Sequence, residues 1–481
     1  MRGGNMKQQV ESQIIEKNEP WKQRYNEKPT GLLGKFEVFL MFFIVLQPIL
    51  DLLTTFCIVV LHSSATIGIV IRLAIMLASC VYLLIKSKEK SNRKYLYYLL
   101  VLGMISTVGL MNNFLTKEPI MLGEEIKFIA KVFYVFVMAA SYIVVFKSLK
   151  QKSNQVMTAI LASSLIISAV MVISIITSTD MNSYDYEKLG SRGWFFAGND
   201  LGAILAIIAP VVAAFAIEKT TSFKQFYYWI PVALIIFSLF AIGTKVGFGA
   251  VVIVTLVSLF MCIIQWIVSK EKETKRKFKV NTIIAGILLV GVIVSTPFTP
   301  IVQNTFIHLN IIEQKQAAKE KEKPEKEKPH TEKEKQKVEQ KKKQEETTAL
   351  IFSGRELFLS NYKHYFSEAP LAQKIFGMGY GGNYEDQPKM IERDFHDMFY
   401  SFGIAGFLCM MFPLAFYGIK MAKIMLMNLR KIFTFKYALL AVSLVLGLGI
   451  AYTAGHVFTS PAVSIYFVAI FAYLLRNLET Q

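Results

Sequence analysis

Basic side chains stand within or beside long apolar stretches of this sequence, where a charge is costly. Six positions are of this kind: Arg72, Lys127, Lys131, Arg192, Lys245 and Arg355. A charge at membrane depth usually faces a cavity or a counter-charge, and Lys127 and Lys131 share one helical face because they are four residues apart. Singly, each could snorkel to the interface or pair with Asp51, Glu124 or Glu125. Together they predict a binding site for a polyanion.

A lipid-linked diphosphate is the polyanion that these residues suit best. The planar guanidinium of arginine bonds two phosphate oxygens at once. Arg355 stands in the first turn of a predicted helix, where the macrodipole favours negative charge. An anion bound jointly by Arg355 and the helix N-terminus would account for that placement. The sequence therefore predicts diphosphate binding by the six basic residues.

A second cluster, Glu392 to Asp397, could carry proton transfer. His396 lies between Asp394 and Asp397 where a predicted span begins, and a neutral histidine beside a carboxylate suits general-base work near pH 7. The alternative is a polar helix start with Asp394 as its N-cap. No comparable carboxylate cluster is expected beside the other histidines, which are His62, His308, His330, His364 and His456.

Apolar stretches of the length of a membrane-spanning helix must position these residues. A hydrocarbon core of roughly 30 Å needs about 20 apolar residues in a helix. About twelve spans are predicted, at 36–60, 66–85, 95–115, 125–146, 155–177, 200–217, 227–243, 247–268, 281–297, 396–419, 437–455 and 460–475. They account for the 53% apolar content of the 481 residues without a large soluble core. The sequence thus predicts an all-α polytopic integral membrane protein.

The distribution of charge indicates the direction of these spans. Lys and Arg concentrate in alternate gaps, beginning with 1–35, whereas the other short gaps hold only Lys117, Lys188, Arg192 and Lys245. By the positive-inside rule both termini are cytoplasmic, and the candidate residues lie on the outer side of the cell membrane. The formal net charge of +18 is this topological signal, so it does not indicate nucleic-acid binding.

One gap is far longer than the others and divides the chain. Residues 298–395 form a predicted extracellular loop between the ninth and tenth spans, with a Lys/Glu-rich spacer at 313–346 and a folded part at 349–395. The other predicted segments are cytoplasmic 1–35, spans one to nine in 36–297, spans ten to twelve in 396–475, and a cytoplasmic tail at 476–481.

The folded part of the long loop contains a helix signal and a turn signal. Ser353 and Glu356 fit a capping box, and the apolar spacing that follows predicts an amphipathic helix at 354–366. The glycine-rich run 377–382 is not followed by the Lys-Ser/Thr of a phosphate loop. It predicts a tight turn through which the chain re-enters the membrane.

Cysteine and histidine spacing gives no sign of a metal or redox site. Cys57, Cys80, Cys262 and Cys409 all fall in predicted spans, and no Cys-x-x-Cys occurs. Neither structural zinc nor thiol redox chemistry is expected. The sequence therefore assigns no metal and no cofactor.

Several motifs, in this order and on this pattern of spans, resemble those of the O-antigen ligase/polymerase family. They are Arg192-Gly-Trp-Phe-Phe-Ala-Gly198-Asn199-Asp200, Gly243-Thr-Lys245-Val-Gly247, Gly354-Arg355, Phe376-Gly-Met-Gly379, and His396-Asp397 followed by Gly403-Ile-Ala-Gly406. Three features depart from the family pattern: Lys245 replaces an arginine, Asp397 stands where asparagine is commoner, and the spacing from His396 to Gly403 is short. The Glu-x-Asp-x-His-Asp string is more similar to surface-polysaccharide polymerases of Gram-positive bacteria.

The resemblance implies a membrane glycosyltransferase of the C type that acts, without a metal, on undecaprenyl-diphosphate-linked sugars. Arg192, Lys245 and Arg355 would bind the diphosphate and stabilise it as the leaving group. His396 or a neighbouring carboxylate would deprotonate the acceptor hydroxyl, which attacks with inversion. The acceptor is either another lipid-linked repeat unit, for a polymerase, or a different glycan of the cell envelope, for a ligase. Membrane lipid and other polysaccharide-assembly proteins are the further partners implied.

Two other classes of function compete with this one. A flippase for the same lipid-linked oligosaccharide would also have twelve spans, but its ionisable residues would gather near the midplane and its halves would repeat. A sensor or scaffold would need a signalling domain, and none is recognisable in the cytoplasmic segments.

Overall fold

The computed structural model describes residues 31–63, 66–149, 155–184, 188–307, 309, 355–384, 388–429 and 433–480. Within these ranges the chain is almost wholly helical, and the one extended pairing is an isolated bridge between Asn182 and Ser191. The predicted spacer at 313–346, Ser353 of the predicted capping box, His308 and His330 lie outside the described ranges.

Twelve of the helices in the described ranges are long and apolar enough to cross a membrane. They are α3 (Gly31–Val59), α4 (Ile67–Lys86), α5 (Arg93–Thr116), α6 (Leu122–Ser148), α7 (Gln155–Ile176), α8 (Gly198–Lys219), η2 with α9 (Phe223–Trp229 and Ile230–Ile242), α10 (Lys245–Val268), α11 with η3 (Lys272–Ser295 and Thr296–Phe298), α16 (Asp394–Met427), α18 (Phe435–Thr453) and α19 (Pro461–Glu479). The prediction of about twelve spans in an all-α polytopic membrane protein is confirmed.

The shortest connection between two spans depends on a glycine. Gly243 ends α9 with a φ of +74°, in the left-handed region that glycine adopts without a side-chain clash. Thr244 then caps α10 by accepting a hydrogen bond from the Gly247 N–H through its hydroxyl, at 3.1 Å. The chain therefore reverses between two spans with only Gly243 and Thr244 between them.

The chain divides into two compact units, Met1–Phe43 and Ile44–Gln481. In the larger unit α8 is the most enclosed helix, and it packs against α7, α9, α10, α18 and α19. Close packing there depends on small residues: a Cβ at Gly447 of α18 would lie 2.6 Å from the ring of Phe467 of α19. In a membrane the hydrophobic effect does not drive helices together, so their association depends on close packing, which small residues permit.

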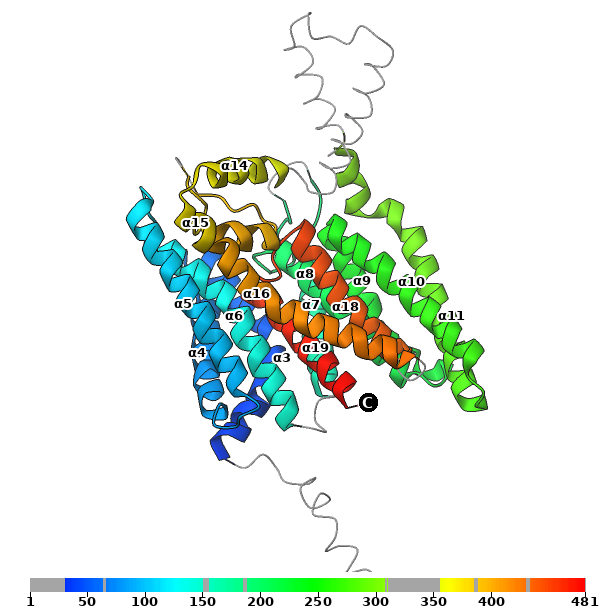
Figure 1. Cartoon of the computed structure of the whole chain (residues 1–481). Helices are drawn as coiled ribbons and strands as arrows, with labels where there is room; N and C mark the ends of the chain where they lie inside the picture. The colour runs from blue at the N-terminus through cyan, green and yellow to red at the C-terminus, as the bar shows by residue number, and fades with distance from the viewer. Residues whose placement is uncertain are drawn as a thin grey trace, which may run out of the picture. The chain divides into compact units, whose positions relative to one another are not determined.

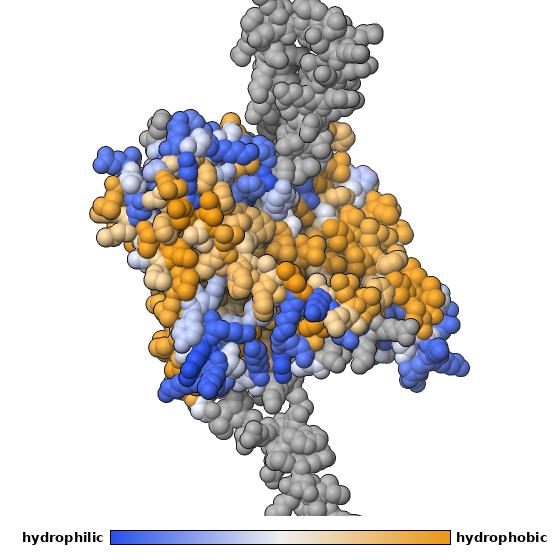
Figure 2. All heavy atoms as spheres, in the orientation of Figure 1, coloured by the Kyte–Doolittle hydropathy of each residue, from blue (hydrophilic) through white to orange (hydrophobic). Residues whose placement is uncertain are grey.

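The polarity of the side chains changes along the length of the helices. Apolar residues gather around the middle of the helices, and hydrophilic residues gather at their two ends (Figure 2). We call the end at which α5 stops and α4, α6, α8 and α19 begin the cavity end. A short helix, α14 (Arg355–Glu368), lies across this end, next to α15 (Leu371–Phe376) (Figure 1). The amphipathic helix predicted at 354–366 matches α14.

The apolar face of α14 packs on the chain that leads into α16. Leu359 and Tyr362 are buried there against Met378, Ile391 and Tyr400. The Tyr362 hydroxyl also donates a hydrogen bond to the carbonyl of residue 389, at 3.1 Å. The face of α14 is therefore buried against protein.

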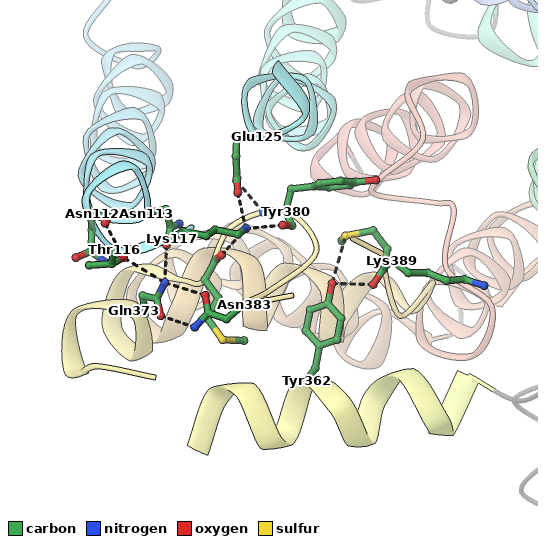
Figure 3. A network of polar contacts seen from close by, with 12 residues as sticks. Asn112, Asn113, Thr116, Lys117, Glu125, Tyr362, Gln373, Tyr380, Asn383 and Lys389 are labelled. Carbon is green, nitrogen blue, oxygen red and sulfur yellow. Dashed lines mark hydrogen bonds and ion pairs between the residues drawn. The ribbon is translucent and has the colours of Figure 1, made fainter. Parts of the chain in front are cut away.

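The glycine-rich turn at 377–382 is held by a buried ion pair (Figure 3). Lys117 Nζ lies 2.7 Å from Glu125 Oε1 and donates to the carbonyls of Met378 and Tyr380. The other oxygen of Glu125 accepts the Tyr380 N–H at 2.7 Å. Gly379 has a φ of +73°, and a Cβ there would lie 2.4 Å from Glu125 Oε2. The turn therefore packs against the end of α5 and the start of α6. Glu125 pairs with Lys117 and not with one of the six predicted diphosphate-binding residues.

Candidate functional site

A cavity of about 710 Å³ opens among the helix ends of the larger unit. Its walls come from α3, α4, α6, α8, the segment 195–197, the loop before α19 and the start of α19, and they are mostly apolar. The charged side chains in the wall are Asp51, Arg72, Lys127, Lys131, Asp200 and His456. Ligand sites commonly combine an apolar wall with a few polar groups that orient the ligand. This cavity is therefore the candidate site.

Three of the predicted basic residues line this cavity, but their charges are not equally available. Arg72 is buried, with Nη2 2.6 Å from Asp51 Oδ1 and Nε 3.0 Å from Gln47 Oε1, so its charge is largely neutralised. Lys127 is exposed and pairs with Glu124 at 3.2 Å, which is a weak interaction in solvent. Lys131 is half-buried, and none of the described residues bonds to its ammonium group. Lys131 is therefore the cation best placed to meet an anion.

The wall also contains a pair formed by His456 and Asp200. His456 Nδ1 lies 3.1 Å from Asp200 Oδ1, and the Ser460 hydroxyl donates to Asp200 Oδ2 at 2.6 Å. Burial by itself would lower the pKa of His456, but the bond to Asp200 and the charges of Asp200, Asp394 and Glu392 outweigh it and raise that pKa to about 9. The expectation that His456 has no carboxylate partner was wrong.

Asp394 holds the loop that carries His456. Its Oδ1 accepts the His456 N–H at 3.0 Å and the Thr459 hydroxyl at 2.7 Å, and its Oδ2 accepts the N–H groups of Val457 and Phe458, both at 2.7 Å. His456 itself has a φ of +68°, a conformation that costs free energy in a residue with a Cβ. Asp394 is therefore a positioning group whose acceptor sites are filled.

The two other candidates of the same cluster also lie away from the cavity. Asp397 accepts the N–H groups of Ile391 and Arg393, each at 2.9 Å, and so stabilises the turn before α16. His396 is half-buried, with its ring centroid 6.3 Å from that of Tyr452. Its Nδ1 is buried and has no hydrogen-bond partner among the described residues. Of these three candidates, only His396 has a side-chain nitrogen or oxygen that makes no hydrogen bond to the described residues.

The loop that carries Arg192 ends at the cavity wall. Arg192 Nη1 donates to the carbonyl of Phe196, a wall residue, and its guanidinium lies 5.5 Å from the Phe196 ring. The same loop packs on the turn before Lys245, because Asn304 Nδ2 donates to the carbonyls of Leu189 and Gly243 at 2.7 and 3.2 Å. The structure therefore brings the Arg192 and Lys245 segments together, although neither side chain is part of the cavity wall.

Arg355 lies in a crossed pair of salt bridges at the start of α14. Its Nη2 is 3.1 Å from Glu392 Oε2, and Arg393 Nη1 is 2.9 Å from Glu356 Oε1. These bonds tie the start of α14 to the chain before α16. Arg355 is not part of the cavity wall, and its partner is a carboxylate.

The family model described as O-antigen ligase like membrane protein matches residues 34–481. The chain belongs to this family. No curated protein matches the sequence. Membership in the O-antigen ligase-like family indicates a membrane enzyme of surface-polysaccharide assembly that handles a lipid-linked glycan donor and an acceptor.

In this O-antigen ligase-like protein, the sequence assigned no role to His456, and Asp200 entered only as the last residue of the Arg192 motif. They are far apart in the chain and meet because α8 packs against both α18 and α19, whose connecting loop carries His456. A signal was present for Asp200, which stands in the first turn of an apolar helix as the chosen cluster does, whereas His456 lies in the short loop before one. Among the described residues, no group of three or more His, Cys, Asp or Glu side chains could hold a metal ion.

Proposed function

We propose that the protein is a glycosyltransferase that joins undecaprenyl-diphosphate-linked oligosaccharide repeat units at the outer face of the cytoplasmic membrane, either polymerising them or ligating them to another glycan. The observation that carries this proposal is the apolar cavity with cations in its wall. A polyprenyl diphosphate has the matching character, because its chain favours apolar surface and its phosphates favour Lys and Arg.

The proposed reaction needs no metal. The acceptor hydroxyl oxygen attacks the anomeric carbon of the donor, the bond from that carbon to the diphosphate oxygen breaks with its electron pair, and the configuration inverts. Lys131 and Lys127 line the cavity, and their cationic groups stabilise the negative charge that develops on the diphosphate. Holding two large substrates together supplies much of the remaining rate.

A base must accept the proton of the acceptor hydroxyl. Asp394 and Asp397 are poor candidates because each carboxylate already accepts buried hydrogen bonds. His396 keeps an open nitrogen, so we retain it as the proposed base. It would act on an acceptor that approaches from the side of α14, with Arg355 and Arg192 contacting the glycans or the diphosphate once the substrates are bound.

The orientation of the chain is part of the proposal. Lys and Arg dominate the gaps opposite the cavity end, so the positive-inside rule puts those gaps and both termini in the cytoplasm. The cavity and the 298–395 loop then face the outside, where a lipid-linked glycan is available after translocation.

The test is an analysis of lipid-linked intermediates in cells that carry Lys127→Ala together with Lys131→Ala, or His396→Ala. The matched control is Lys224→Ala, which removes a charge at the opposite end of the helices. A polymerase defect leaves single repeat units on the carrier outside the membrane, and a ligase defect leaves long chains there. Intermediates trapped on the cytoplasmic face would instead support a flippase, and normal intermediates in well-expressed variants would overturn the site.

A further inference from the structure

The buried nitrogen of His456 that does not face Asp200 has no described partner. His456 Nδ1 points to Asp200, whereas Nε2 is buried and accepts or donates no hydrogen bond among the described residues. His456 is nevertheless part of the cavity wall. A buried polar group without a partner costs free energy, and a ligand in the cavity would supply the missing partner.

The surroundings of His456 are built to hold this geometry. Its backbone has positive φ, and Asp394 accepts its N–H together with three further donors of the same loop. Asp200, which orients the ring, is itself fixed by the Ser460 hydroxyl. Residues kept in costly conformations by several bonds cluster at functional sites. The ring is therefore preorganised, with one nitrogen left for a ligand.

We propose that His456 is a substrate-binding residue whose Nε2–H donates a charge-assisted hydrogen bond to an oxygen of the donor diphosphate, with Asp200 and Asp394 as positioning residues. This inference rests on the proposed function. The proton stays on the nitrogen throughout, and the imidazolium stabilises the charge that the diphosphate gains when it leaves.

The state of the ring favours a donor over a base. With its pKa raised to about 9, only about one His456 ring in a hundred is neutral at pH 7. A general base needs the neutral form, whereas an anion-binding group needs the charged one. The charged groups that act on it are Asp200 on α8, Glu392 before α16 and Asp394 at the start of α16, and Lys131 on α6 lines the same cavity. Apart from Lys131, these groups are anionic and favour the imidazolium.

The test measures binding of undecaprenyl diphosphate to the full-length protein in lipid nanodiscs between pH 7 and 10. We expect His456→Gln, which keeps a neutral donor, to raise the Kd at least tenfold at pH 7. The Kd of the unsubstituted protein rises as pH passes about 9, and this step is absent in His456→Gln. His364→Gln is the matched control, because His364 is exposed on α14.

Failure of this inference and failure of the proposed function give different results. If the unsubstituted protein binds undecaprenyl diphosphate and transfers glycan, but His456→Gln does so equally well, the function stands and the assignment of His456 is wrong. If the unsubstituted protein does not bind the probe at all, the proposed function fails first. Thermal unfolding of each variant, together with the histidine NMR signals of the unsubstituted protein with and without the probe, separates loss of binding from misfolding.

Discussion

The hydrogen bonds of Asp394 permit a sharp test of how the loop at 456–459 is positioned. In Asp394→Asn an amide NH2 replaces one carboxylate oxygen, and each of these oxygens accepts two donors. An NH2 at the Oδ2 position would strand the N–H groups of Val457 and Phe458. At the Oδ1 position it would strand the N–H of His456, while the Thr459 hydroxyl can turn to accept. The second orientation is therefore the cheaper one.

The expected cost follows from that count. One stranded buried N–H costs about 1–3 kcal/mol, and the loss of the negative charge weakens the bonds that remain. We expect Asp394→Asn to lower the free energy of unfolding by about 2–4 kcal/mol. Because the stranded group belongs to His456, the ring also loses its position. The affinity for undecaprenyl diphosphate then falls at least tenfold, even where the protein is fully folded.

Asp397→Asn is the matched control for this experiment. Each oxygen of Asp397 accepts one buried N–H, from Ile391 or Arg393. The amide of Asp397→Asn therefore leaves one buried N–H without an acceptor, which costs about 1–3 kcal/mol. Asp397 makes no described bond to the 456–459 loop. Unfolding in mixed micelles and binding in nanodiscs are measured on both variants. Equal losses of affinity, or an Asp394→Asn protein as stable as the unsubstituted one, would refute the reasoning.

Two further substitutions test the supports of the site. Gly379→Ala places a Cβ 2.4 Å from Glu125 Oε2 at a φ of +73°, so a loss of about 1–3 kcal/mol is expected in thermal unfolding. Gly249→Ala, which meets no atom within 4 Å, should change little, and an equal effect of the two would contradict the account. Arg72→Met leaves the half-buried Asp51 without its counter-charge and should cost about 3 kcal/mol, whereas adding Asp51→Leu should restore most of that stability. A double variant as unstable as the single one would show that the pair does not act as a unit.

Much of the fold could be predicted because the membrane imposes it locally. A span needs only a continuous apolar stretch, and this requirement is written in consecutive residues. The twelve predicted spans match the twelve helices, and even the close pair around residue 243 is separated by a turn that glycine permits. The helix at 354–366 was predictable for the same reason, since its periodicity is local. The docking of the 377–382 turn on Lys117 and Glu125 was not, because it joins distant segments.

The site was only partly predictable. Charges in apolar stretches pointed to Arg72, Lys127 and Lys131, and these three do line the cavity. The same reasoning could not tell which charge is cancelled by a neighbour, as Arg72 is by Asp51. Asp394 was predicted as a possible base, whereas its hydrogen bonds to the 456–459 loop give it a positioning role, and no local pattern contains those bonds.

The sequence by itself determined that this is a polytopic helical membrane protein of the O-antigen ligase-like family, because hydropathy and motif order are properties of neighbouring residues. Only the tertiary structure decided which ionisable groups share a cavity. His456 and Asp200 meet because α8 packs against α18 and α19, whose connecting loop carries His456. The protonation of His456 depends on burial and on charges brought from other helices. Such distances are set by packing, and packing is a property of the whole chain.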